Sequence, residues 1–592
     1  MKKGIIKGGS FLIDSLQPED IFTPEDTNAD QKLLSKVTDE FFQGEVEPRI
    51  EELEAKEEGL MVKLLKKSAK LGLQGLDIPE EFGGMGLDII SSLIVTERIS
   101  LGGPFAIASL DHTTFATLSI LYFGTREQKE KYLPDLATAD KIGAFALTEP
   151  DAGSDALNAS TIARLSEDGN WYILDGEKQF ISNAKYADIF ITFAKIEGEK
   201  FTTFIVDRNS EGLSLGEEED KMGIRGTSTR SLILTNSKVP RQNLLFEPGK
   251  GHVVAFSILN IGRYKIAGLC LGTAKLALKD SISYAKSRIQ FGKPISDFGL
   301  IKEKIGEMAI RIFVVESMIY RTSGLIKEGL KGTDLTSNKT SLDLLHGLQE
   351  YAIECSMNKV YSSEMLDYVV NEAVQIHGGY GYIKDYRVER YYRDSRINLI
   401  YGGTNEINRL LIIRLLFTRA LKGQLSLAEA MDKALSERSE ISVYSVSQRI
   451  ELKEMAFLVE NAKKIALISM KGIYQTYSPN LEYQQEILGM ISNIIIEVFA
   501  MESTLLRSQK IREKWGGDKS EVPLAISRVY IVEGLMRVER WSKILLAGIL
   551  KGDRLQTRLA MVKDLSEYIP VDLIGLRRTI ADSMLQASRY FI

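Results

Sequence analysis

The chain has 592 residues, of which 44% are hydrophobic and 26% charged, so it is long enough for several compact units and is neither a disordered nor a fibrous sequence. Its net charge of -5 gives no reason to expect nucleic acid as a partner, because nucleic-acid binding needs a concentrated basic surface. Two cysteines and four scattered histidines provide neither a disulfide framework nor a metal-ligand spacing, and we expect no metal and a reducing, cytoplasmic location.

The N-terminal part, from about residue 31 to residue 141, has mostly helical periodicity, interrupted by a glycine-rich turn at residues 77–87 (DIPEEFGGMGL). Residues 1–10 contain lysines but no apolar segment long enough for a secretion signal. The apolar stretch 487–501 is interrupted by Glu497, and no uncharged run approaches the roughly 20 residues that span a bilayer. We therefore expect any membrane association to be peripheral.

A group of short runs with strand character follows the first helical part. These runs occupy residues 171–174, 189–196, 201–207 and 231–235. Dipeptides typical of turns, such as Asp175-Gly176 and Glu197-Gly198, separate them. This pattern predicts a small antiparallel β domain in the middle of the chain.

Helical periodicity returns after Phe256 and continues to about Leu421, with one apolar face formed by Ile266, Leu269, Cys270, Ala274 and Ala277. Cys270 lies on this face, so we interpret it as a core residue and not as a nucleophile. A last helical segment carries an apolar stripe formed by Leu452, Met455, Val459, Ala462 and Ala466. This segment is expected to be an appended bundle.

The order of elements predicts an α+β fold with a mainly helical body. We expect an N-terminal helical domain at residues 30–143 and a middle β domain at 144–255. A C-terminal four-helix bundle at 256–422 and an appended helical domain at 426–592 are expected to follow.

The middle domain opens with residues 144–155 (AFALTEPDAGSD), where a strand-like run ends in a Pro/Gly turn rich in hydroxyl and acidic residues. Such a turn exposes backbone N–H groups, and Thr148 and Ser154 can hydrogen-bond a polar heterocycle or a phosphate. Taken alone, the segment is better interpreted as a simple β turn.

Further motifs follow in a fixed order: GEKQFISN at 176–183, KMGIRGTSTR at 221–230, NIGR at 260–263, RIQFG at 288–292, QIHGGYG at 375–381, RYYRDSR at 390–396 and IYGGTNE at 400–406. Together with the turn at 144–155, they resemble the signatures of the acyl-CoA dehydrogenase family over roughly residues 30–420. The appended helical segment resembles that of the very-long-chain branch, whose members are typically dimers. The resemblance implies a homodimer, an acyl-CoA substrate, and an electron-transfer flavoprotein or similar protein as acceptor.

The resemblance also implies FAD as the cofactor. The residues that it assigns to FAD are Leu147, Thr148, Ser154, Phe180, Ile181, Ser182, Arg288, Phe291, Gln375, Gly378, Gly379, Thr404 and Glu406. Ser154 and Arg263 are the implied substrate contacts. A guanidinium such as that of Arg288 suits a diphosphate, and the glycines permit close approach of the backbone. Taken by itself, Arg288 is better interpreted as part of a surface salt bridge.

In the family, a carboxylate removes the α proton of the thioester while hydride leaves the β carbon, and the backbone N–H at the base position helps to polarise the thioester carbonyl. That base is the glutamate directly before the Gly-Thr pair or, in one branch, directly before the arginine matched here by Arg263. This chain has Gly402 at the first position and Gly262 at the second. Glu406 is a candidate substitute; if the segment begins a helix, it is displaced from Gly402 by about 6 Å.

Two milder departures accompany the missing base. Phe180 stands where the family more often has tryptophan beside the flavin, and residues 111–115 (DHTTF) lack the usual glycine-containing pattern. Phe180 retains the ability to stack, whereas Phe115 is expected to reshape the acyl pocket.

Three functions are compatible with this sequence. The first is an FAD-dependent dehydrogenase of fatty-acid β-oxidation that converts a long-chain acyl-CoA to trans-2-enoyl-CoA despite Gly402. The second is a catalytically impaired pseudoenzyme that binds FAD and acyl-CoA in an assembly or sensing role. The third is a flavoprotein whose substrate has a proton acidic enough to need no protein base.

Overall fold

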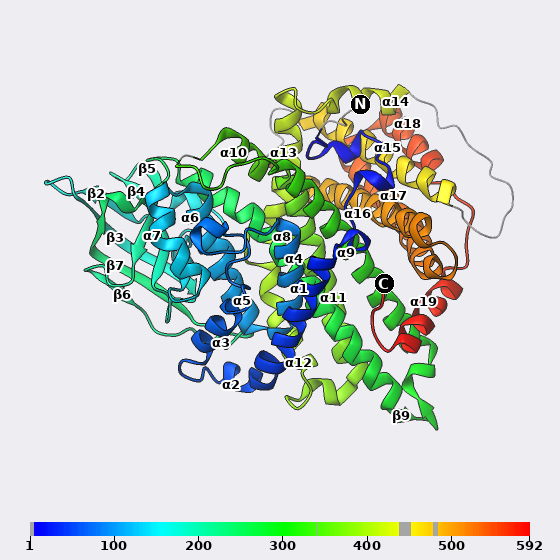
Figure 1. Ribbon diagram of the computed structural model, residues 1–592. Helices are drawn as coiled ribbons and strands as arrows, with labels where there is room; N and C mark the ends of the chain where they lie inside the picture. Colours follow the sequence, from blue (N-terminus) through cyan, green and yellow to red (C-terminus); the bar gives the residue numbers. More distant parts are fainter. Residues whose placement is uncertain (1–4, 339, 437–451, 478–482) are drawn as a thin grey trace.

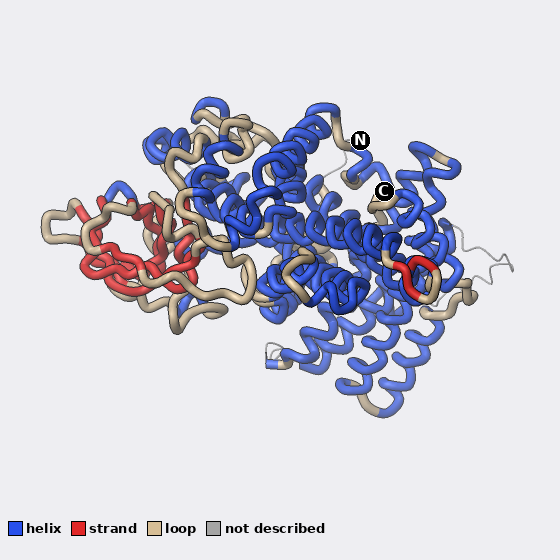
Figure 2. The backbone as a smooth tube through the Cα atoms, turned by 90° about the horizontal axis from the view of Figure 1, so that it is seen from below, coloured by secondary structure: helices blue, strands red, loops and turns tan. Residues whose placement is uncertain are grey.

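The computed structural model describes residues 5–338, 340–436, 452–477 and 483–592. Figure 1 shows the β strands at one end of the molecule and long helices through the rest, and Figure 2 shows the same separation from below. The order of elements is helices, strands, helices and further helices. The predicted α+β fold with a mainly helical body is therefore confirmed.

The N-terminal helical region consists of α1 (Ala29–Phe41), α2 (Ile50–Glu54), α3 (Leu60–Ala69), α4 (Ile89–Ile99), α5 (Pro104–Leu110), α6 (Leu118–Phe123) and α7 (Arg126–Ala137). Side chains of Asn28 and Thr125 cap α1 and α7 by accepting backbone N–H groups of the first turn. A π-helical segment, Asp111–Thr117, separates α5 from α6. Such segments place side chains off the regular helical positions and often occur at functional sites.

The sheet contains β1 (Gly143–Ala146), β2 (Ile162–Leu165), β3 (Trp171–Ser182), β4 (Ile189–Ile196), β5 (Lys200–Asp207), β6 (Leu213–Leu215), β7 (Thr229–Pro240) and β8 (Leu244–Leu245). Its order is β6-β7-β3-β2-β4-β5-β8, and β1 pairs with β4. The pairs β1–β4 and β2–β4 are parallel. The predicted middle β domain is confirmed, and most of its strand pairs are antiparallel, but β4 pairs in parallel with β1 and β2 because crossovers and not hairpins connect it to them.

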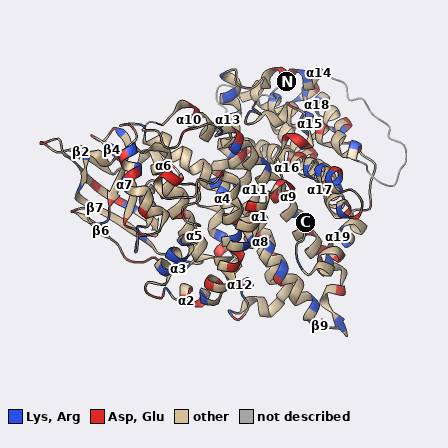
Figure 3. Ribbon diagram, viewed as in Figure 1, with Lys and Arg blue, Asp and Glu red and all other residues tan. Residues whose placement is uncertain are grey.

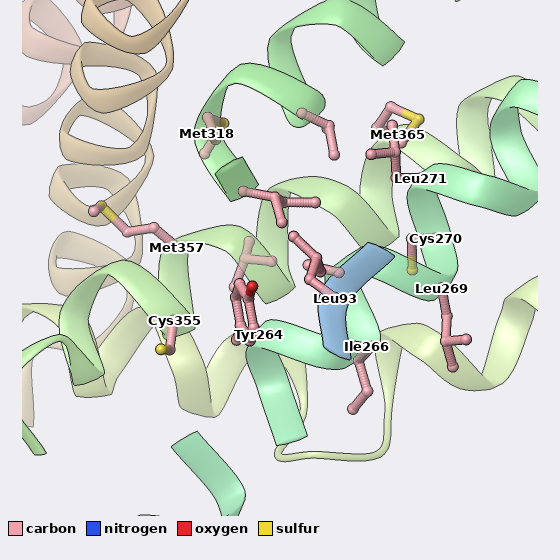
Figure 4. Packing of buried hydrophobic residues seen from close by; sticks show 14 of the residues in the cluster. Leu93, Tyr264, Ile266, Leu269, Cys270, Leu271, Met318, Cys355, Met357 and Met365 are labelled. Atoms are coloured by element: carbon pink, nitrogen blue, oxygen red, sulfur yellow. The ribbon is translucent and has the colours of Figure 1, made fainter. Parts of the chain in front are cut away.

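The third region consists of α8 (Gly251–Ser287), α9 (Gly299–Gly329), α10 (Leu342–Glu350), α11 (Ala352–His377), α12 (Val388–Ser395) and α13 (Asn405–Leu421). Helices α8, α9 and α11 pack against one another, and α13 packs on α11. Figure 4 shows Cys270 of α8 among buried methionine and leucine side chains. Cys270 is fully buried, and burial raises its pKa to about 12, as expected for a core residue.

The appended helices are α14 (Leu427–Ser436), α15 (Leu452–Tyr477), α16 (Gln485–Trp515), α17 (Glu521–Ile549), α18 (Gly552–Leu565) and α19 (Leu573–Ala587). Four residues of the predicted stripe on α15 are buried: Met455, Val459, Ala462 and Ala466. Helix α15 packs against α16 and α17, while α16 and α19 pack on α9. The extension is thus joined to the body of the protein through α9.

A buried ionic network lies at the junction of α9 and α16. Arg507 of α16 pairs with Glu316 of α9 at 2.7 Å and with Glu25 of the N-terminal segment at 2.8 Å. Tyr590, close to the C-terminus, donates a hydrogen bond of 2.7 Å to Glu316. Segments from both ends of the chain therefore meet at one fully buried guanidinium.

Helices α8 and α16 are long and apolar enough to cross a membrane by length and composition alone. In their most apolar windows, however, 83% and 78% of the residues are buried inside the protein. Burial of this extent is typical of helices in a protein core. Figure 3 shows lysine, arginine, aspartate and glutamate interspersed over the ribbon, with no uniformly basic element.

Candidate functional site

The turn after β1 is held by a buried ion pair. Glu149 and Lys178 lie 2.6 Å apart, and the side chains are 1% and 0% exposed. Ser160 and Thr161 donate further hydrogen bonds to Glu149. Burial by itself raises the pKa of Glu149, but the charge of Lys178 and these hydrogen bonds hold that pKa at about 2. The ion pair and these hydrogen bonds therefore hold the turn that begins at Thr148 in place against the sheet.

This turn lies directly against β3. The N–H of Gln179 donates to the carbonyl oxygen of Thr148 at 2.8 Å. Leu147 is buried, Thr148 is half-buried, and Ser154 is exposed. The structure thus brings Leu147 and Thr148 beside residues 179–182, as the motifs predicted, while Ser154 lies on the outer part of the turn.

Phe180 is presented to solvent by a β-bulge. The pairing of β3 with β7 shifts between Lys178 and Ile181, and Phe180 at this irregularity has φ +59°. A positive φ is strained for a bulky side chain and marks sites that the surrounding structure holds in place. The ring is 62% exposed, whereas Ile181 is buried and Ser182 half-buried. An exposed aromatic ring on a rigid strand is suited to stacking on a planar ligand.

Gly402 and Gly403 form a left-handed turn just before α13. Their φ angles are +67° and +85°, values that glycine adopts freely and other residues rarely do. Thr404 caps α13 by accepting from the N–H of Ile407. Because the helix begins at Asn405, Gly402 lies outside it, and the expected spacing of one helical turn between Gly402 and Glu406 does not apply.

Glu406 faces solvent in the first turn of α13. Hydrogen bonds from its own backbone N–H and from the Thr404 hydroxyl lower the pKa of this carboxyl below its ordinary value. A lowered pKa makes a carboxylate a weaker base. The structure therefore gives no support to Glu406 as the substitute base.

Arg263 and Lys359 hold the Gly402–Gly403 turn from the side of the helical core. The Nε of Arg263 donates to the carbonyl oxygen of Gly402 at 2.9 Å, and its second nitrogen donates to Asn260 at 2.9 Å. Lys359 donates to the carbonyl oxygen of Gly403 at 2.8 Å. Sequence reasoning missed Lys359; a lone lysine among the buried positions of α11 was the available signal.

Phe115 fills the space beside the second base position. A Cβ built on Gly262 would lie 2.5 Å from the Phe115 ring, so a glutamate there requires this ring to move. Phe115 also contacts Phe145 of β1, with ring centroids 5.6 Å apart. Phe115 thereby connects α8 with the strand that leads to Thr148.

Asp111 is a second polar group of this region that sequence reasoning did not assign. One carboxyl oxygen is buried without a hydrogen-bond partner among the described residues. Burial raises the pKa of Asp111 well above its ordinary value, although the Phe145 N–H lowers it. Burial therefore favours the neutral form of this carboxyl over the carboxylate.

A second cluster lies at the end of α11. A groove of about 470 Å³ is lined by Arg288, Gln290, His377, Gly378 and Gly379 among others. No atom lies within 4 Å of a Cβ built on either glycine. Arg288 has its guanidinium 5.6 Å from the centre of the Tyr380 ring, and among the described residues it has no salt bridge. The unpaired guanidinium on this groove favours an anion-binding site over the surface ion pair that the sequence also allowed.

Close to this groove, a two-stranded ribbon is formed by β9 (Ile289–Gln290) and β10 (Lys293–Pro294). Phe291 at its tip is 94% exposed. Gln375 is exposed one turn before the groove. Figures 1 and 2 place this ribbon at the opposite end of the molecule from the sheet that carries Phe180. One chain therefore does not bring the two predicted ends of the cofactor site together.

The three regions match the corresponding parts of a known family. The chain matches the acyl-CoA dehydrogenase N-terminal domain over residues 28–140, the middle domain over 144–237, and C-terminal domains over 249–417 and 461–564. The chain belongs to the acyl-CoA dehydrogenase family.

Individual relatives match either nearly the whole chain or about two thirds of it. A probable acyl-CoA dehydrogenase of Bacillus subtilis is 44% identical over 588 residues, 99% of this chain and 98% of the relative. The crystal structure of an acyl-CoA dehydrogenase from Bacillus anthracis, complexed with FAD, has a TM-score of 0.96 at 44% identity and covers 99% of this chain and 100% of that chain. A subunit of the caffeyl-CoA reductase–Etf complex of Acetobacterium woodii is 38% identical over 394 residues, 66% of this chain and 98% of the relative.

Proposed function

We propose that this protein is an FAD-dependent acyl-CoA dehydrogenase of fatty-acid β-oxidation that converts a long-chain acyl-CoA to trans-2-enoyl-CoA, with Gly402 in place of the usual catalytic glutamate. The observation that carries the proposal is the joining of three segments. The Thr148 turn is hydrogen-bonded to the strand of Phe180, and Phe115 links that sheet to α8, whose Arg263 holds Gly402.

The residues present fit FAD. The exposed Phe180 ring offers a stacking face for the isoalloxazine, and Thr148, Ile181 and Ser182 lie beside it. At the other end, Arg288 and the open glycines 378 and 379 suit a diphosphate. When bound, FAD supplies the acceptor for the hydride that leaves the β carbon.

Replacing Arg288 with alanine is expected to weaken FAD binding about ten- to hundredfold, because a charge-assisted hydrogen bond to phosphate contributes about 1.5–3 kcal/mol. Dialysis followed by the absorbance of retained flavin measures this. Arg164→Ala is the matched control, since Arg164 is exposed in the β domain and pairs with Asp175. Equal flavin retention by the two variants would remove Arg288 from the cofactor site.

The chain's own groups can orient the thioester but provide no charged base at Gly402. Within the described residues the N–H of Gly402 has no hydrogen-bond partner, so it is free to donate to the thioester carbonyl oxygen. Arg263 fixes the adjoining peptide, between Gly402 and Gly403, by binding the Gly402 carbonyl. The α proton must be accepted by a group other than residue 402.

The second candidate function is a pseudoenzyme that keeps FAD and acyl-CoA without turning them over. Two observations favour it: both base positions are glycine, and Phe115 occupies the space beside Gly262. A substrate with an unusually acidic proton is the third possibility raised by the sequence.

Anaerobic titration with a panel of acyl-CoA thioesters tests the proposal. We expect acyl-CoA to perturb the flavin spectrum and then to reduce the flavin slowly, because binding survives the loss of a base that accelerates the reaction about 10²- to 10⁴-fold. Spectral perturbation without any reduction would support the pseudoenzyme. A purified protein that takes up no flavin would contradict both functions.

A homodimer is part of the proposal, because the exposed Phe291 and the Arg288 groove lie far from the strand of Phe180 in the same chain. Two copies can each complete the other's cofactor site. Light scattering should give twice the mass of the chain, and Phe291→Asp should shift the protein toward monomer with loss of FAD. A monomer that retains FAD fully would contradict this assembly.

The electron acceptor is proposed to be an electron-transfer flavoprotein or a similar protein, supported by the relative that works in an Etf complex. Cytoplasmic location remains part of the proposal. Reduction of a purified electron-transfer flavoprotein by the acyl-CoA-loaded protein is the direct test of the acceptor.

A further inference from the structure

The loss of a carboxylate at Gly402 leaves two buried cations beside the turn. Arg263 is 5% exposed and Lys359 is 0% exposed. Arg263 donates to the Gly402 carbonyl and Asn260, while Lys359 donates to the Gly403 carbonyl and Asn405. All four acceptors are neutral. Among the described residues, neither cation has a carboxylate within salt-bridge distance.

A buried charge with only neutral partners is costly, because the charge has given up water without gaining an opposite charge. The pKa values of both cations reflect this cost. Burial lowers the pKa of Arg263 to about 10 and the pKa of Lys359 to about 8. By contrast, the buried cations Arg507 and Lys178 have carboxylate partners. The pair beside Gly402 is therefore prepared for an anion that the nearby side chains do not supply.

An anion can approach the turn where residue 402 lacks a side chain, provided that the Ile266 methyl group rotates away. Only Ile266 Cδ1, at 2.9 Å, and Arg263 Cγ, at 3.9 Å, come within 4 Å of a Cβ built on Gly402. A Cβ built on Gly403 lies 3.6 Å from a terminal nitrogen of Arg263. Both glycines are half-exposed. An entering group thus meets a methyl group, the stem of an arginine and one edge of its guanidinium.

We propose that Arg263 and the Gly402–Gly403 turn form a binding site for a carboxylate that comes from the ligand and not from the chain. The guanidinium offers the planar donor edge that a carboxylate oxygen pair prefers. Two sources share this chemistry: a free small carboxylate, or a carboxylate carried on the acyl group of the thioester. The inference rests on the proposed function only in its choice of the thioester as the second source.

A bound carboxylate also provides the proton acceptor that the proposed reaction needs. The α C–H bond breaks and an O–H bond forms on the carboxylate, while the electron pair of the C–H bond forms the new double bond as hydride leaves the β carbon for the acceptor already proposed. No further oxidant is required. The chain's part in this step is to hold the carboxylate through Arg263.

Formate is the first probe, and its binding is measured on the full-length, FAD-loaded protein without acyl-CoA. We expect formate to raise the thermal midpoint saturably relative to chloride at the same ionic strength and pH. Gly402→Glu should abolish this effect by placing its own carboxylate beside Arg263, and Arg263→Gln should abolish it by removing the cation. An equal response of wild type and Gly402→Glu to formate would overturn the proposal. If Gly402→Glu does not fold, an equal response of wild type and Arg263→Gln would overturn it.

The two sources are separated by kinetics and by affinity. For a free carboxylate, formate should accelerate flavin reduction by an unsubstituted acyl-CoA at least about tenfold in wild type but not in Gly402→Glu. For a carboxylate on the acyl group, a dicarboxylic acyl-CoA should bind at least about tenfold more tightly than its monocarboxylic counterpart of equal length, and Gly402→Glu should erase the preference. Absence of both effects would overturn the proposal. A saturable formate shift with no flavin reduction by any thioester would instead refute the proposed function and leave the carboxylate site standing.

Discussion

Gly402→Glu is expected to raise the rate of flavin reduction by acyl-CoA at least about tenfold, with little change in acyl-CoA affinity. A positioned general base contributes about 10²- to 10⁴-fold, or roughly 3 to 5 kcal/mol of barrier at 1.36 kcal/mol per tenfold change. Arg263 already holds the carbonyl of this residue, so the new carboxylate gains a neighbouring positive charge. Stopped-flow absorbance under anaerobic conditions measures the rate.

The local structure is the reason that we expect a gain of only at least about tenfold and not the full contribution of a general base. Gly402 has φ +67°, and a left-handed conformation costs a side-chain-bearing residue about 1–2 kcal/mol. The Cβ would also lie 2.9 Å from Ile266 Cδ1, so that methyl group must rotate away. Gly402→Gln has the same shape and strain but no base, and it is the matched control. Equal rates for the Glu and Gln variants would show that residue 402 does not act as the base.

A different set of rates would assign the role of base to Glu406. If wild type reduces flavin rapidly, Glu406→Gln abolishes this, and Gly402→Glu brings no gain, then Glu406 must be the proton acceptor. The exposed position and lowered pKa of Glu406 make us expect the opposite, a rate for Glu406→Gln close to that of wild type.

Arg507→Met is expected to lower the free energy of unfolding by about 3–5 kcal/mol, because buried Glu25 loses its counter-ion and buried Glu316 loses one of its two cations. Glu25 and Glu316 are 3% and 4% exposed, and Arg507 itself is 0% exposed. Urea denaturation followed by circular dichroism measures the loss. Lys238→Met is the control, since the exposed pair Lys238–Glu211 should contribute less than about 1 kcal/mol. Equal losses in both variants would show that the network contributes no more than a surface pair.

The same network predicts acid sensitivity. Burial alone would raise the pKa of Glu316, but Lys275 and Arg507 hold it at about 2, below its ordinary 4.5. A lowered folded-state pKa stabilises the protein fully above pH 4.5, and this stabilisation is lost as the pH falls from 4.5 toward 2. Because Arg507→Met removes one of the two cations, its acid transition should begin at a higher pH than that of wild type.

The sequence alone determined most of the architecture. Helical spacing identified the buried face of α8, with Cys270 in the core, and alternating runs identified β3, β4, β5 and β7. Residue identity alone also established that both base positions are glycine. These features are local, because periodicity and the absence of a side chain do not depend on distant contacts. The parallel pairing of β4 was missed because it depends on crossover connections.

Tertiary structure decided how the charges are used. Taken alone, Arg288 was better interpreted as part of a surface salt bridge, and only the fold shows its guanidinium on an open groove beside Tyr380. The sequence assigned Arg263 and Lys359 no shared role, yet the two bind adjacent carbonyl groups of a turn whose residues are more than 40 positions further along the chain. A charge is paired or unpaired according to which distant segments fold against it, and burial then fixes the cost of leaving it unpaired.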